Sequence, residues 1–160
     1  MKATTLRHAP LPAQPIDQIA LDYDARFLRR KLLRTVSGAE VMVDLPKVTA
    51  LADGDALETD AGLVQIVAAA EPVLIITGDL PRLAWHIGNR HTPCQIEPFH
   101  LVIRADHVLR TMLVGLGAQI TDATRPFTPE GGAYGAAQVM GHDHGHSHAH
   151  AHGHHHHPHD

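Results

Sequence analysis

Residues 73–127, VLIITGDLPRLAWHIGNRHTPCQIEPFHLVIRADHVLRTMLVGLGAQITDATRPF, decide the fold of this chain. The stretch begins with a short apolar run, 73–77, which is typical of a buried strand. Asp79 can then cap a helix that tolerates Pro81 in its first turn, and Gly88-Asn89 can end it. Between these signals, apolar residues recur at helical spacing at Leu80, Leu83, Ala84 and Ile87. The pattern therefore predicts a strand followed by a helix.

The second half of the stretch predicts two further strands, a second helix and a last strand. Residues 94–98 and 100–105 predict two short strands joined around Pro98-Phe99. Residues 106–117 predict a second helix, ended by Gly117, and residues 118–127 predict a last strand. The apolar face of that helix is assigned to Val108, Leu109, Met112, Leu113 and Leu116. The full order is β-α-β-β-α-β, which is typical of a ferredoxin-like sheet with two helices on one face.

The preceding segment, from about residue 16 to residue 73, has the pattern of an all-β domain. Residues 29–36 and 40–46 flank a Ser37-Gly38 turn and predict a hairpin. Turn signals at Asp53-Gly54 and 60–62 follow, and 63–69 is a further β-type run. Short strands at this spacing predict a small barrel or sandwich.

The end of the chain has a different composition. Residues after Phe127 are rich in glycine and then in histidine, and such sequence cannot bury a core. We therefore predict an α+β protein with three parts: an all-β N-terminal domain (1–72), a ferredoxin-like domain (73–135) and a disordered His-rich tail (136–160).

Composition limits the classes of function. The formal net charge is -4 with histidine neutral, which argues against a nucleic-acid partner because such proteins normally carry a basic patch. No apolar run is long enough to span a bilayer, and prolines interrupt the N-terminus where a signal peptide would need an apolar run. Cys94 is the only cysteine, so no intrachain disulfide can form. These features predict a cytoplasmic protein without a membrane partner.

Eleven histidines near the end of the chain predict divalent-metal binding. They are His142, His144, His146, His148, His150, His152, His154, His155, His156, His157 and His159. Neutral imidazole binds Ni, Cu, Zn and Co, and the absence of nearby thiolates disfavours Cu(I). Copper(II) would win in vitro on intrinsic affinity, so the sequence alone does not select nickel. The longest uninterrupted run is four histidines, which is unlike a cloning tag.

Alternatively, a tail of this kind serves only to buffer metal ions, without a defined binding site. A flexible set of ligands loses conformational entropy each time it binds and holds no fixed geometry. A storage or buffering protein whose tail does the work is therefore the alternative to a protein with a defined site in its folded part.

His107 is the candidate for that defined site. Helical phase places it away from the apolar face of its helix, on the same side as Thr111 and Val114. This side is either solvated or a subunit contact. If it lies on a two-fold axis, His107 meets its own copy and two ligands arise from one residue. Tail histidines would then fill the remaining positions.

The other titratable residues predict little chemistry. His91 follows the first helix and is expected to fix a turn by a structural hydrogen bond, while His86 flanks an apolar face and His100 has no assigned role. His8 is interpreted as incidental, and Cys94 as a small buried apolar residue. Gly-x-Ser-x-Gly, P-loop and His-Glu-x-x-His motifs are absent from the sequence. We therefore predict that the protein is not an enzyme.

Several motifs together resemble one family, the UreE urease accessory proteins. They are LAWHIGNRHTPCQIE (83–97), LVIRADHVLRTMLVGLGAQIT (101–121), RPFTPEGGAYG (125–135) and the terminal histidines, in that order. Residues 51–76, LADGDALETDAGLVQIVAAAEPVLII, also resemble the family's first domain.

The resemblance implies a nickel metallochaperone. It implies a homodimer formed through the second domain, with the family's metal histidine in the DHVL motif, which is His107 here. It also implies an N-terminal domain that binds protein partners, and transfer of Ni(II) to the urease apoprotein through a complex with the urease accessory GTPase. Some members carry further histidines in the last strand, but 118–127 has none here, so His142 and His144 are the expected substitutes. Zn(II) or Cu(II) are expected to bind in vitro.

Overall fold

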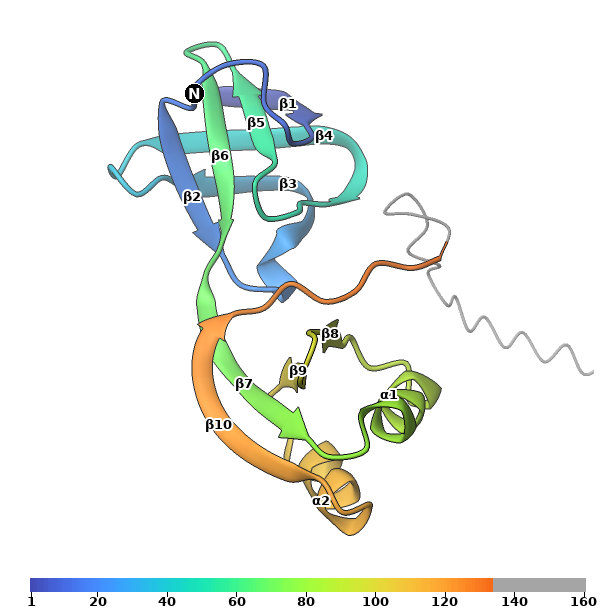
Figure 1. Ribbon diagram of the computed structural model, residues 1–160. Coiled ribbons are helices and arrows are strands. Elements are labelled where there is room, and N and C mark those ends of the chain that lie inside the picture. Colours follow the sequence, from blue (N-terminus) through green and yellow to red (C-terminus); the bar gives the residue numbers. More distant parts are fainter. Residues whose placement is uncertain (134–160) are drawn as a thin grey trace, which may run out of the picture.

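The computed structural model describes residues 1–133, which form two sheets joined by a continuous chain (Figure 1). The predicted disorder of 136–160, together with all eleven tail histidines, lies outside the described residues. Neither helix in the part described is long and apolar enough to cross a membrane.

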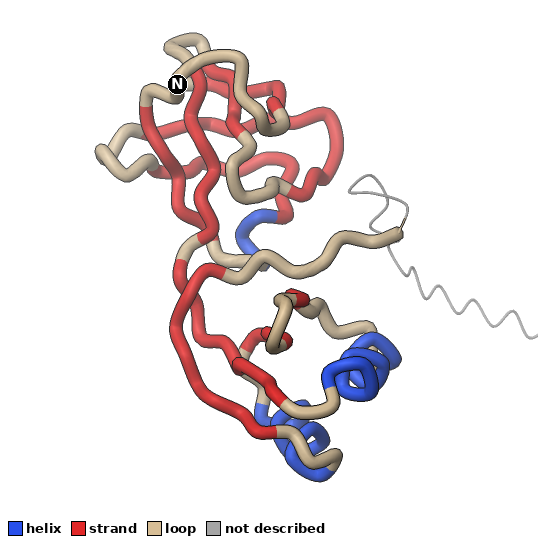
Figure 2. Tube along the Cα trace, viewed as in Figure 1, coloured by secondary structure: helices blue, strands red, loops and turns tan. Residues whose placement is uncertain are grey.

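The first sheet confirms the all-β prediction for the N-terminal region. Its six strands follow the order β2-β6-β5-β1-β4-β3 and curl so that β3 and β4 cross the direction of β2 and β6 (Figure 1). Figure 2 shows that the only helical piece here is one short turn, η1 (Asp24–Arg26). The strands are β1 (Lys2–Arg7), β2 (Asp17–Leu21), β3 (Phe27–Arg34), β4 (Glu40–Ala50), β5 (Ala56–Thr59) and β6 (Leu63–Ala68).

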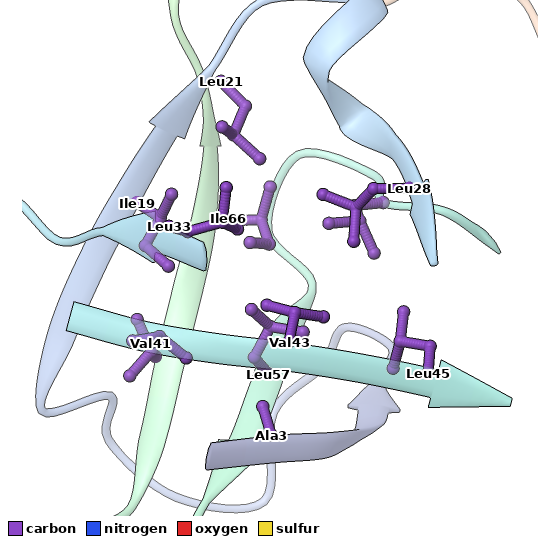
Figure 3. Close-up of a cluster of buried hydrophobic side chains, with 12 residues drawn as sticks. Ala3, Ile19, Leu21, Leu28, Leu33, Val41, Val43, Leu45, Leu57 and Ile66 are labelled. Atoms are coloured by element: carbon purple, nitrogen blue, oxygen red, sulfur yellow. The ribbon is translucent and has the colours of Figure 1, made fainter. Parts of the chain in front are cut away.

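The alternation in the sequence accounts for the core of this sheet. Val41, Val43 and Leu45 occupy every second position of β4, and all three are buried. Their side chains meet Ile19 of β2 and Ile66 of β6 in one aliphatic cluster (Figure 3). Burial of this cluster is the main stabilising contribution to the first domain, because its apolar area leaves water on folding.

Strand β1 precedes the β region expected from the sequence. It lies between β5 and β4, pairing antiparallel with the first and parallel with the second. Its sequence, KATTLR, is mostly polar, and Ala3 is its only fully buried side chain. The alternation signal was therefore too weak to predict a strand that the neighbouring strands stabilise.

The second sheet confirms the ferredoxin-like prediction. Its strand order is β10-β7-β9-β8, with each neighbouring pair antiparallel. Both helices pack on one face, against a core that includes Leu74, Ile76, Leu83, Ile103 and Leu113. The elements are β7 (Ala70–Thr77), α1 (Leu80–Asn89), β8 (Gln95–Ile96), β9 (Leu101–Arg104), α2 (His107–Gly115) and β10 (Gln119–Pro126).

Val108 corrects one detail of the predicted core. It was assigned to the apolar face of α2, but its side chain is 56% exposed. Five positions separate it from the buried Leu113, which is a rotation of about 140° around a helix of 3.6 residues per turn. Val108 is therefore apolar in type but lies on the outer side of α2.

The two domains are joined through a small aromatic cluster. Phe127, directly after β10, is fully buried and packs with Val73 and Val102 on the sheet face opposite the helices. Its ring meets the edge of Tyr23 at 5.5 Å between centroids. Buried Arg26 donates a hydrogen bond to the Phe127 carbonyl oxygen. The segment after β10 is thus tied to the first domain.

Candidate metal centre

Helix α2 begins at His107, one residue after the predicted start, and its cap determines how His107 is presented. Asp106 is extended, and its carboxylate accepts a hydrogen bond from the Leu109 N–H at 2.9 Å. This is the usual role of aspartate at a helix N-cap, and it makes His107 the first helical residue. Buried Leu109 and Leu113 then orient the helix, so that the His107 side of α2 faces outward.

The outer face of α2 has the composition predicted for it. His107, Thr111 and Val114 are all exposed, and the Thr111 hydroxyl donates to the His107 carbonyl oxygen at 3.0 Å. Val108 and Val114 are 56% and 55% exposed, so α2 carries two exposed apolar side chains after His107. In Figure 1, α2 lies at the end of the second domain farthest from the first sheet. This surface is open to a partner.

His107 does not have enough neighbours in its own domain to hold a metal ion tightly. Among residues 1–133, no group of three or more His, Cys, Asp or Glu side chains is placed to bind one ion. A cavity of about 550 Å³ lies between the first domain and residues 128–132, but His107 does not line it. A metal ion at His107 would therefore need further ligands from a second chain or from the tail, where the predicted histidines lie outside the described residues.

Two other histidines lie beside carboxylates. His100 Nε2 lies 2.8 Å from Glu97 Oε2, and the Glu97 carboxylate also pairs with Arg125 of β10. His8 Nδ1 lies 3.2 Å from the buried carboxylate of Asp55. Neither of these histidine–carboxylate pairs was predicted from the sequence. Forty-seven residues separate His8 from Asp55, so no local pattern could show that pair, whereas a Glu97–His100 spacing of three is a weak signal outside a helix.

His86 and His91 are parts of α1 and its end. The His86 ring packs edge-on against Trp85, with centroids 5.0 Å apart. His91 has a positive φ of 56°, and its backbone N–H donates to the Gly88 carbonyl oxygen at 2.9 Å. A non-glycine residue in this conformation is uncommon, and histidine is among the types that adopt it. The His91 backbone therefore contributes to the way α1 ends before β8.

Cys94 is half-buried against the helix-side core, as the sequence suggested for a small apolar side chain. Burial raises the pKa of its thiol to about 11, because the low-dielectric surroundings disfavour the thiolate. The thiolate is the form that binds metal and attacks electrophiles. Cys94 is therefore a poor metal ligand at neutral pH.

We expect Cys94 to react slowly with iodoacetamide at pH 8 in the folded protein. The raised pKa lowers the thiolate fraction, so alkylation should be roughly 10- to 100-fold slower than in the urea-unfolded chain. The chain has one cysteine, so mass spectrometry of the labelled protein follows a single site. Equal alkylation rates in the folded and unfolded chain would contradict this prediction.

Comparison with known proteins identifies the family. The N-terminal domain model of the UreE urease accessory proteins matches residues 2–70, and the C-terminal domain model matches residues 71–160. The chain is 62% identical over 128 residues to the urease accessory protein UreE of Rhodobacter capsulatus, covering 79% of this chain and 82% of that protein. It is 55% identical over 131 residues to the same-named protein of Paracoccus denitrificans, covering 81% and 83%. The chain therefore belongs to the UreE family of urease accessory proteins, which act in urease maturation and are not enzymes.

Proposed function

We propose that this protein is a cytoplasmic homodimer that carries Ni(II) as cargo to the active site of apo-urease. The observation that supports this most is the exposed His107 at the start of α2, on a surface that also carries the exposed Val108 and Val114. One imidazole does not make a tight site, and no complete ligand set surrounds it among the described residues. A two-fold axis through this face brings two copies of His107 together, and the valines supply apolar area for the contact.

The proposed partners are the urease apoprotein complex and the urease accessory GTPase. Neither nucleic acid nor a membrane is a proposed partner, since the formal net charge of the chain is -4. The eleven tail histidines act as a secondary, low-precision set that collects ions and completes coordination at His107. We expect the tail also to bind Zn(II) or Cu(II) in vitro, because imidazole accepts all three metals.

Imidazole ligation suits delivery rather than storage. A site of a few imidazoles, without thiolates and open to solvent, can exchange its ion with a partner. Protons compete with metal for imidazole nitrogens, so the affinity for Ni(II) should fall as the pH is lowered toward 6. Metal binding to such a site is therefore reversible under mild conditions.

Deletion of residues 142–160 tests whether the defined site lies in the folded part. We expect the truncated protein to lose most weak Ni(II) binding but to keep about one ion per two chains, because the two copies of His107 remain. Isothermal titration calorimetry with Ni(II) measures both phases. A full-length control with the eleven tail histidines changed to asparagine separates loss of imidazoles from loss of chain length.

The same experiment tests the alternative function. If all divalent binding disappears in both variants, the protein is a buffer whose tail does the work, and the His107 assignment is wrong. If the truncated protein keeps its tight ion and still activates urease when nickel is ample, delivery is supported.

A further inference from the structure

Strand β3 carries an unusual concentration of positive charge. Its sequence, FLRRKLLR, holds Arg29, Arg30, Lys31 and Arg34 and no acidic residue, whereas the whole chain has a formal net charge of -4. All four of these side chains are exposed. We call residues 29–34 the basic edge, because β3 is the terminal strand of its sheet and pairs only with β4 (Figure 1).

Two cations of the basic edge form no ion pair in the part of the chain described, although Asp44 of β4 lies opposite Arg30 in the strand register. Arg34 pairs with Glu40 of β4 at 3.3 Å, and Arg29 Nε donates to the Leu45 carbonyl oxygen at 3.4 Å. Arg30 and Lys31 form no ion pair with any residue in 1–133. Neighbouring like charges repel one another, so an external anionic group would lower the energy of this surface.

Apolar area lies among these charges. Leu32 is 50% exposed, and Met42 lies directly opposite it in the register of β3 and β4. Arg30, Leu32 and Arg34 alternate along the strand and share one face, because side chains of a strand repeat every second residue. The pairing is continuous from Arg30 opposite Asp44 to Arg34 opposite Glu40. The basic edge thus presents cation, apolar group and cation at a regular spacing.

The backbone of β3 adds a third property. A terminal strand leaves every second N–H and C=O without a ladder partner on its outer side, and such an edge is a template for an added strand. Charged residues on edge strands also have a simpler role, which is to block self-association. A blocking role requires charge of either sign, whereas recognition of an acidic partner requires positive charge.

We propose that the basic edge binds an extended acidic segment of a protein partner, which adds to the sheet as a strand beside β3. This inference deepens the proposed function, because the partner belongs to the machinery of urease maturation. The segment carries an acidic, an apolar and an acidic residue at alternate positions. Its carboxylates meet Arg30 and the neighbouring cations, its apolar side chain covers Leu32 and Met42, and its backbone pairs with the free side of β3.

A charge-reversal experiment tests the sign dependence. The probe is purified urease apoprotein complex, and its association with the full chain is measured by biolayer interferometry at low and high salt. The double variant Arg30→Glu/Lys31→Glu should weaken association at least about tenfold and reduce its salt dependence. The double variant Arg82→Glu/Arg90→Glu on α1 makes the same change in net charge and should bind as the unchanged protein does.

Three outcomes would overturn the proposal. The first is equal affinity of the Arg30→Glu/Lys31→Glu variant, which is what a purely blocking role requires. The second is an unchanged rate of hydrogen exchange for the amides of residues 30–34 on complex formation, because an added strand must protect them. The third is that the basic edge binds a short duplex DNA more tightly than the apoprotein complex.

The tight Ni(II) phase, titrated in the same two variants, keeps this proposal distinct from the proposed function. It should be unchanged, because neither pair of residues lies on the outer face of α2. Loss of apoprotein binding with nickel binding intact supports the basic edge. Absence of a tight nickel phase in the unchanged protein contradicts nickel delivery instead.

Discussion

The His107→Ala variant is expected to lose the tightest phase of Ni(II) binding, with a fall in affinity of roughly 100-fold or more. Loss of residues that merely orient a ligand costs 10- to 100-fold in many metal sites, and in the proposed dimer both copies of a direct ligand would disappear together. The fold should be retained, since His107 is exposed and contributes nothing to the core around Leu109 and Leu113. Calorimetric titration of the full-length variant measures the effect.

The control for this variant removes an imidazole elsewhere. His86 lies on α1 against Trp85, outside the proposed site, so His86→Ala should keep the tight nickel phase. Dimer formation of both variants, followed by analytical ultracentrifugation, separates loss of a ligand from loss of the interface. The exposed Val108 and Val114 remain in His107→Ala, so we expect a dimer without a tight site. An unchanged tight phase in His107→Ala would remove this residue from the metal centre.

The second large effect is expected at the junction of the domains. Phe127→Ala should lower the free energy of unfolding by about 3–5 kcal/mol, the usual cost of deleting a fully buried phenylalanine ring. The ring is fully buried against Val73 and Val102 and meets Tyr23, so its removal leaves a cavity that these neighbours cannot easily fill. The loss should also weaken the contact between the domains, because the Phe127 ring is the group that meets Tyr23 of the first domain.

Phe99 supplies the matched control for this prediction. It is also a phenylalanine of the second domain, but it is 85% exposed between β8 and β9. Phe99→Ala should therefore change the free energy of unfolding by no more than about 0.5 kcal/mol. Urea unfolding followed by the fluorescence of Trp85, the single tryptophan, reports the second domain in both variants. Similar effects of the two substitutions would mean that Phe127 is not an anchor.

The two predictions concern different parts of the second domain, and they should be separable. Phe127 lies on the sheet face opposite the helices, whereas His107 lies on the outer side of α2. Phe127 contacts the first domain, whereas His107 is the proposed metal ligand. Nickel affinity of the folded Phe127→Ala protein should therefore be close to that of the unchanged chain.

Local sequence signals predicted the second domain well, because its elements follow short periods. Asp79 caps α1 as expected, and the buried positions of α1 repeat at the helical spacing. The outward phase of His107 followed from the same period, since Leu109 and Leu113 must face the sheet. Val108 was wrongly assigned to the buried face of α2 because it is apolar. The residue type of a side chain at the start of a helix does not show which way it points.

By itself, the sequence determined the β-α-β-β-α-β order, the all-β character of the first domain and the exposure of His107. Each of these depends on the spacing of residues that are close together in the chain. Only the tertiary structure revealed β1 between β4 and β5, the His8–Asp55 pair and the contact of Arg26 with Phe127. The last two join residues 47 and 101 positions apart. Such pairs depend on how the whole chain packs, and no local periodicity records that path.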